Sequence, residues 1–298
     1  MNTRTCYQFD TVNTITADCP DSVLEEAVRR CEAYHRRFSR FEPDSEIARI
    51  NRSSGAPVPV SEDTVRMLRA AEEVSAASDG AFSLSVGRLV SLWNCKAEKP
   101  EPPSEDRILA AREEALSTGY EICGDAVVKT GNGDLDLGGI AKGYIADRIA
   151  DLLREAGTRH GLLNFGGNIV TIGGKEDGCP WRIGLQTPGA AWGKAYWAAV
   201  ESTDGTVVTS GITERGFEHG GKWYHHIIDP RTGRPAETDL LSVTVIGTES
   251  MTADALATAA LILGPDAGLG LLHRFGTKGV FLLRDGTVVR SKDLRLLM

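Results

Sequence analysis

Apolar residues recur every three or four positions in several segments, which is the spacing of helices that bury one face. Leu24, Ala27 and Cys31, for example, would share one face of a helix. A short helix is expected after Asp44 or Ser45, since either side chain can cap it. The predicted helices span 21–40, 44–51, 61–79, 104–115, 140–157, 250–264 and 265–275.

Other segments alternate between apolar and polar residues or form short apolar runs, as strands do. Two glycine-containing turns are expected, one at 131–133, joining two strands of a hairpin, and one at 166–167, interrupting a strand. Segment 80–93 is apolar but too rich in small residues to assign. The predicted strands span 7–17, 120–129, 134–137, 161–173, 181–186, 241–246 and 279–290, the last turning at 285–286.

Helices and strands are mixed along the whole chain, and no internal repeat is visible. This order predicts an α+β fold of mixed helices and mainly antiparallel strands. We expect one domain over 7–292, because no linker longer than the proline-rich loop near 100–103 separates two halves. A bilobal form with the active site in the cleft remains open.

Composition narrows the classes of partner. The chain has 298 residues, a net charge of −8 and no basic stripe, so nucleic acid is not expected as a partner. Its six cysteines lack C-x-x-C spacing, so neither a zinc site nor a disulfide framework is expected. No run of about 18 apolar residues predicts a membrane span, and no signal peptide is recognisable. The expected location is the cytoplasm.

Segment 134–147 is the strongest local candidate for binding chemistry. A short alternating stretch ends at Gly138-Gly139 and leads into a helix, with Lys142 in its first turn. A helix start carries free N–H groups and partial positive charge, which suit phosphate. The pattern matches neither the P-loop nor G-x-G-x-x-G, so a purely structural turn explains it equally well.

Asp254 and Thr258 lie four residues apart in a helix otherwise made of small and apolar residues. They would therefore share one face, and their oxygens form a ligand pair for a hard cation. The alternative is that Asp254 caps the helix or faces water. Taken by themselves, the two residues favour that alternative.

Two adjacent histidines, His225 and His226, end a strand that runs into a turn. Asp229, Pro230 and Gly233 are typical of such a turn, whereas the histidines are not explained by it. Since alternation directs the two rings to opposite faces, only one is expected to face a cleft. A histidine there can act as a general base towards a hydroxyl, although a structural role is the commoner one.

The order of seven motifs along the chain is more specific than any single motif. Together they resemble the FAD:protein FMN transferases, the ApbE family, over nearly the whole chain. The motifs are SEIARIN (45–51), GAF (80–82), DLGGIAKG (136–143), NFGG (164–167), TSG (209–211), HIIDP (226–230) and TADALAT (252–258).

This resemblance implies a magnesium-dependent enzyme of α+β fold. Members of the family cleave FAD at its pyrophosphate and transfer FMN to a Ser or Thr hydroxyl of an acceptor flavoprotein, releasing AMP. The resemblance also implies site residues, with His226 as the base and Asp254 as the second catalytic residue. The implied magnesium ligands are Asp254, Thr258 and the main-chain carbonyl of Gly139; the implied FAD contacts are Phe9, Asn51, Ala81, Phe82, Ser83, Asp136, Lys142 and Ile228.

The sequence departs from the family pattern at two of these places. Family members often have Met-Gly-Thr where this chain has Phe9-Asp-Thr11, and Asp where it has Ser83. Two other functions stay open: an FAD pyrophosphatase, in which water replaces the acceptor hydroxyl, and a flavin carrier without chemistry.

Overall fold

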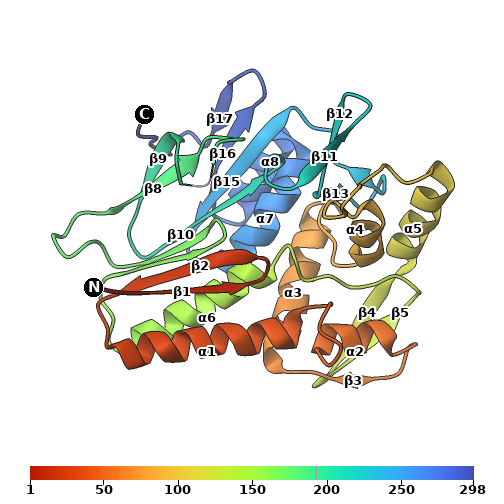
Figure 1. Ribbon diagram of the computed structural model, residues 1–298, viewed down its shortest axis with the longest axis horizontal. Coiled ribbons are helices and arrows are strands. Elements are labelled where there is room, and N and C mark those ends of the chain that lie inside the picture. Colours follow the sequence, from red (N-terminus) through yellow and green to blue (C-terminus); the bar gives the residue numbers. More distant parts are fainter. Residues whose placement is uncertain (192) are drawn as a thin grey trace.

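An eight-stranded antiparallel sheet forms the centre of the computed structural model, which describes residues 1–191 and 193–298 (Figure 1). All seven neighbouring strand pairs in this sheet are antiparallel. In spatial order the strands are β1 (Asn2–Gln8), β2 (Thr11–Ala17), β6 (Gly161–Phe165), β7 (Asn168–Ile172), β10 (Thr206–Gly211), β15 (Leu240–Gly247), β16 (Lys278–Leu283) and β17 (Val288–Arg290).

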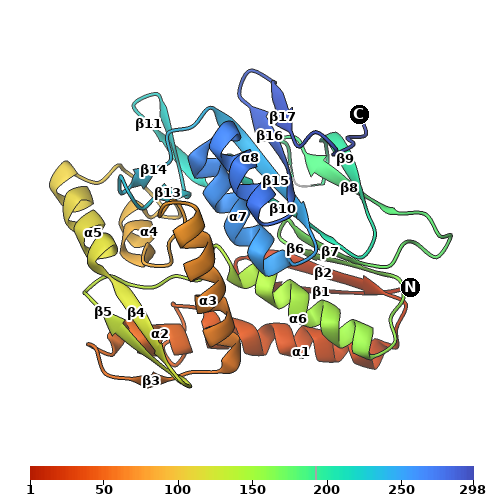
Figure 2. The same ribbon diagram turned by 180° about the vertical axis from the view of Figure 1, so that it is seen from behind.

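Four helices cover one face of this sheet, as Figure 2 shows from behind. The two faces of the sheet pack against different partners, because neighbouring residues of a strand point to opposite faces. On β10, Val208 belongs to the main core beneath the helices, whereas Val207 packs with the hairpin of β8 (Trp181–Gln186) and β9 (Tyr196–Ser202). None of the helices in the described part of the chain is long and apolar enough to cross a membrane. The four covering helices are α1 (Asp21–Phe38), α6 (Ala141–Glu155), α7 (Ser250–Leu263) and α8 (Pro265–Arg274).

Beside the sheet lies a second group of elements (Figure 1). Some of its residues, such as Ile47 and Met67, belong to the main core, and others form a small apolar cluster of their own. Trp93, Phe217 and Ile228 belong to this cluster, which therefore joins helices to short strands far along the chain. The elements are α2 (Glu46–Arg52), α3 (Glu62–Ala77), α4 (Gly87–Trp93), α5 (Glu105–Ser117), the sheet β3 (Val58–Pro59), β5 (Ala126–Thr130) and β4 (Gly119–Cys123), and the pairs β11 (Gly216–His219) with β12 (Lys222–His225) and β13 (Ile228–Asp229) with β14 (Arg234–Pro235).

The predicted α+β class with mainly antiparallel strands is confirmed. The predicted helices are present, and the expected cap at Ser45 is made: its Oγ accepts from the Ala48 N–H at 3.0 Å. Ser61 Oγ caps α3 in the same way, accepting from the Thr64 N–H. The unassigned segment 80–93 contains α4. The domain limits 7–292 and the bilobal form stay predictions.

The prediction of one strand over 7–17 is wrong, because the chain turns back at Phe9 and Asp10. Both residues have φ of 58°, the left-handed conformation that two-residue hairpin turns require. The turn joins β1 to β2. It lacks the glycine that usually marks such a turn, so the pattern of apolar residues continued across it.

The hairpin predicted with its tip at 131–133 is also wrong. The actual turn is at Gly124-Asp125, between β4 and β5. Segment 134–137 is not a strand; the Asn51 amide bonds both backbone groups of Leu135, donating to its carbonyl at 2.9 Å and accepting from its N–H at 2.8 Å. A side chain thus replaces the strand partner that the alternating pattern suggested.

Segment 161–173 is a hairpin of β6 and β7, and not one interrupted strand. The double glycine turns the chain, with φ of 58° at Gly166 and 97° at Gly167. The C-terminal hairpin turning near 285–286 is confirmed as β16 and β17.

Helices α6 and α7 pack unusually close at Gly143. A β-carbon built on Gly143 would lie 2.1 Å from the Ser250 carbonyl oxygen, so the two backbones nearly touch. One turn further, the Asp147 carboxylate accepts from the N–H groups of Ser250 and Met251 at 2.9 and 2.8 Å and so caps α7. Burial raises the pKa of Asp147 to about 7, while both N–H donors act in the opposite direction.

We expect Gly143→Ala to destabilise the protein by about 3 kcal/mol, because the added methyl group forces α6 and α7 apart. Gly270→Ala is the matched control, since a β-carbon on this exposed residue of α8 meets nothing within 4 Å. Urea unfolding should show a loss for the first variant and no loss for the second. Equal stability of both variants would contradict the close packing.

Candidate functional site

The turn before α6 is held by the carboxylate of Asp136. Its Oδ1 accepts from the Gly138 N–H at 2.8 Å, and its Oδ2 lies 2.7 Å from Nε of Arg40. Both side chains are mostly buried, which strengthens the ion pair. Arg40 also donates to Ser91 Oγ at 2.9 Å. Asp136 therefore fixes the turn that contains Gly139, and Arg40 fixes Asp136.

A carboxylate lies at the start of α6, where the sequence suggested a phosphate. Asp254 Oδ2 accepts from the Gly143 N–H at 3.1 Å, and the Lys142 ammonium lies 3.3 and 3.4 Å from the two carboxylate oxygens. Only 3% of Asp254 is exposed. The alternatives that Asp254 faces water or caps its own helix are therefore wrong, and Asp147 is the residue that caps α7.

Gly139 and Thr258 meet beside this carboxylate. A β-carbon built on Gly139 would lie 3.7 Å from Thr258 Oγ1 and 3.0 Å from Cε2 of the buried Phe82. Thr258 follows Asp254 by one helical turn on α7. The structure thus brings Gly139, Phe82, Lys142, Asp254 and Thr258 into one region.

The oxygens in this region fit a hard cation by their chemistry. A carboxylate, a hydroxyl and main-chain carbonyls are the donors that magnesium prefers. Within the described residues, no group of three or more His, Cys, Asp or Glu side chains could hold a metal ion. A cation bound here would accordingly depend on one carboxylate, that of Asp254, supplemented by neutral oxygens.

The His226 ring has one nitrogen held by the backbone. Its Nδ1 lies 3.1 Å from the Arg215 carbonyl oxygen, which can only accept, so Nδ1 carries the proton and Nε2 keeps a lone pair. Burial lowers the pKa of His226 to about 4, and the positive charge of Lys142 adds to this effect. The ring is therefore neutral near pH 7 and can accept a proton at Nε2.

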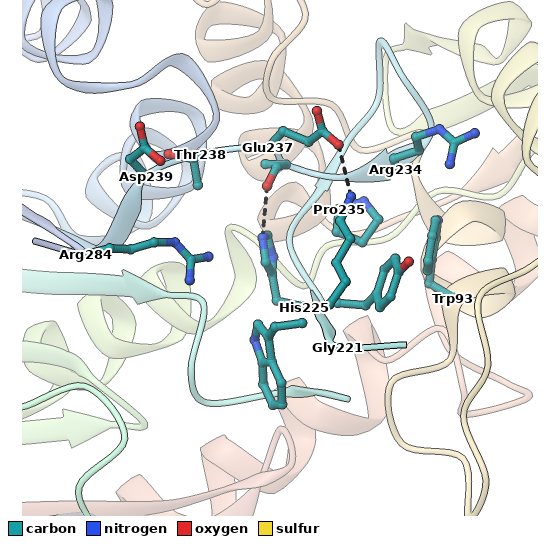
Figure 3. A pocket seen from close by; sticks show the side chains of 13 residues that line it. Trp93, Gly221, His225, Arg234, Pro235, Glu237, Thr238, Asp239 and Arg284 are labelled. Carbon is teal, nitrogen blue, oxygen red and sulfur yellow. Dashed lines mark hydrogen bonds and ion pairs between the residues drawn. The ribbon is translucent and has the colours of Figure 1, made fainter. Parts of the chain in front are cut away.

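His225 is the last residue of β12, and His226 lies just beyond the strand. The two rings bond different carbonyls, those of Ala236 and Arg215. His225 lines a cavity of about 570 Å³ together with Trp93, Glu237 and Arg284, and Figure 3 shows these side chains around it. The His225 Nε2 donates to the Ala236 carbonyl at 3.0 Å, and its Nδ1 accepts from the Ile227 N–H at 3.3 Å. Because both nitrogens are used, the His225 ring is structural.

Several predicted flavin contacts are engaged within the protein. Phe9 lies at the β1–β2 turn and packs edge-on against His35 with ring centroids 5.1 Å apart. The Asn51 amide bonds Leu135. Ala81 is buried next to Phe82, the Ser83 hydroxyl accepts from the Ser85 N–H at 3.1 Å, and the Ile228 side chain packs in the small apolar cluster. Contacts of these residues with FAD stay predictions.

Three residues that contribute to the site's geometry had no role assigned from the sequence: Arg40, Gly143 and Asp147. Arg40 stands in a basic run at the end of α1, which reads as an ordinary exposed helix end. Gly143 and Asp147 act on α7, more than 100 residues away. Local sequence carries no signal of such contacts.

Comparison with known proteins gives one consistent answer. The model of the ApbE family matches residues 4–281. FAD:protein FMN transferase from Klebsiella pneumoniae (strain 342) is 36% identical over 85% of this chain and 79% of its own length. The protein of the same name from Treponema pallidum (strain Nichols) is 35% identical over 92% of this chain and 80% of its own length.

Solved structures agree with these sequence matches. The ApbE protein from Thermotoga maritima superposes with a TM-score of 0.88, at 29% identity, over 98% of this chain and 97% of that chain. The flavinyl transferase ApbE from Pseudomonas stutzeri, in its apo form, has a TM-score of 0.84 at 31% identity, over 98% and 94% of the two chains. The chain described here therefore belongs to the ApbE family.

Proposed function

We propose that the protein transfers FMN from FAD to a Ser or Thr hydroxyl of an acceptor flavoprotein and releases AMP. Relatives covering most of the chain carry the name FAD:protein FMN transferase. The observation that carries the proposal is the convergence of Lys142, Asp254, Thr258 and Gly139 at the start of α6. A pyrophosphate needs positive charge and N–H donors at such a place.

In this proposal magnesium is held by Asp254, Thr258 and the Gly139 carbonyl, and when bound it neutralises charge on the pyrophosphate. Lys142 supplies a second positive charge on a mostly buried side chain. Asp136 and Arg40 keep the Gly138-Gly139 turn in place. The charge that develops on the leaving phosphate thus meets positive charge at the start of α6.

His226 would accept the proton of the acceptor hydroxyl at Nε2. The hydroxyl oxygen then bonds to the FMN phosphorus, and the bond from that phosphorus to the bridging pyrophosphate oxygen breaks. The electron pair leaves with AMP, and the product is a phosphoester between FMN and the acceptor. The hydrogen bond from Nδ1 to Arg215 keeps the ring in the tautomer that this step needs.

Product analysis separates this function from the two other candidates. Incubation with FAD, magnesium and an acceptor flavoprotein should give labelled acceptor and AMP in equal amounts. An FAD pyrophosphatase would form free FMN at the same rate with and without acceptor. Unchanged FAD over a long incubation would instead indicate a carrier.

The pH dependence of transfer should reflect the low pKa of His226. Because burial lowers this pKa to about 4, the base stays neutral until the pH falls close to that value. We expect kcat/KM for the acceptor to be flat from about pH 8 down to about pH 5, and to fall below that. Unfolding curves at each pH control for loss of structure. An acid limb centred near 6.5, the ordinary value of histidine, would contradict this environment.

A further inference from the structure

Lys142 and Asp254 form an ion pair in the region where the proposed function needs a cation. The ammonium lies 3.3 and 3.4 Å from the two carboxylate oxygens, so it takes up both of them. The Gly143 N–H takes a further lone pair of Oδ2 at 3.1 Å. Both carboxylate oxygens of Asp254 thus contact the first turn of α6.

A divalent cation on Asp254 would compete directly with Lys142. A cation bound to either oxygen would lie close to the ammonium, where the two positive charges repel strongly at low exposure to water. Gly143 cannot give way in the same manner, because it belongs to the tight α6–α7 contact. Lys142 can, since its long stem is flexible and about a quarter of its side chain is exposed.

We propose that Lys142 is an exchangeable group: a divalent cation displaces its ammonium from Asp254, and the released ammonium pairs with the FAD pyrophosphate. The identity of the anion, the pyrophosphate of FAD, rests on the proposed function. The exchange gives Lys142 a role in coupling the two binding events: the ammonium weakens cation binding while the nucleotide is absent.

Two consequences follow from the exchange. The cation binds weakly without FAD, because it must break the ion pair with Lys142. The cation and FAD then strengthen each other's binding by equal factors, since the released ammonium gains the pyrophosphate as partner. Direct contact between cation and pyrophosphate would also couple them, so the decisive measurement is cation binding without nucleotide.

The test is a calorimetric titration of the intact protein with Mg²⁺, in the absence of FAD. Lys142→Met keeps the apolar stem and removes the competing charge, so its affinity for Mg²⁺ should be at least about tenfold higher than that of the wild type. Lys142→Gln, a second neutral variant, should behave alike. Lys142→Arg keeps the charge and should stay near the wild type. Lys292→Met, which removes a charge from an exposed position after β17, controls for net charge.

Equal or weaker Mg²⁺ binding by both neutral variants would overturn the exchange, and so would an equal gain in Lys292→Met. Acceptor labelling tests the function separately. If wild-type protein labels the acceptor but neutral variants show no gain, the exchange is wrong and the function stands. If the neutral variants bind Mg²⁺ more tightly but the wild-type protein labels no acceptor, the competition at Asp254 stands. The transferase function is then wrong, and so is the pyrophosphate as the partner of Lys142.

Discussion

Replacing Asp254 with Asn will lower the rate of FMN transfer by about 10³-fold, the loss typical of removing a key electrostatic group. Asn has nearly the same shape but no negative charge, and only one oxygen remains to face Lys142, Gly143 or a cation. Since Asp254 is the single carboxylate in the proposed donor set, cation binding should be lost with it. The measurement is single-turnover labelling of the acceptor at saturating FAD and Mg²⁺.

Asp151→Asn is the matched control for this variant. Asp151 lies on α6, is more exposed than Asp254, and pairs with Arg148 and Arg154 of the same helix. Its replacement should leave the rate close to that of the wild type. An Asp254→Asn protein that remains folded and transfers FMN at the normal rate would remove Asp254 from the site.

Replacing His226 with Ala will lower transfer by about 10²- to 10⁴-fold, the usual contribution of a general base. FAD affinity should change by only a few fold, because the proposed role of the ring is towards the acceptor hydroxyl. Transfer rates and FAD binding are measured on the same protein. Added imidazole should restore part of the rate, since it can occupy the space of the missing ring. A normal rate in His226→Ala would exclude His226 as the base.

His225→Ala provides the contrasting result. The ring of His225 is buried and both of its nitrogens are hydrogen-bonded, so its loss should reduce the free energy of unfolding by about 2 kcal/mol. The transfer rate of the folded fraction should stay close to normal. Loss of the His225 ring would then lower stability, whereas loss of the His226 ring would lower the transfer rate.

Most helices could be predicted from the sequence, because α1, α3 and α6 each have an apolar face, and α2 and α3 begin at the caps Ser45 and Ser61. Helix α4 could not be predicted, because its segment is rich in small residues. The prediction failed where the turn or the partner was atypical. Phe9-Asp10 adopts a two-residue hairpin turn without glycine, and Leu135 pairs with the Asn51 side chain instead of a strand. Such features depend on contacts that local patterns do not encode.

The candidate site shows the same limit more clearly. From the local sequence, the helix start at Lys142 could bind phosphate or be a purely structural turn, with neither favoured. For Asp254, the local sequence favoured capping the helix or facing water. The family resemblance linked these residues across more than 100 positions, and the structure places them 3.3 Å apart. Arg40 and Asp147, which support the site through ion pairing and capping, carried no sequence signal because each acts on a distant element.

The most direct test of the proposed function is the mass of an acceptor flavoprotein after incubation with the protein, FAD and Mg²⁺, with AMP measured in the same sample. We expect the acceptor to gain one FMN moiety for each AMP released, and its Ser- or Thr-to-Ala variant to gain none. AMP and free FMN formed without any mass gain in the acceptor would contradict the proposed transfer.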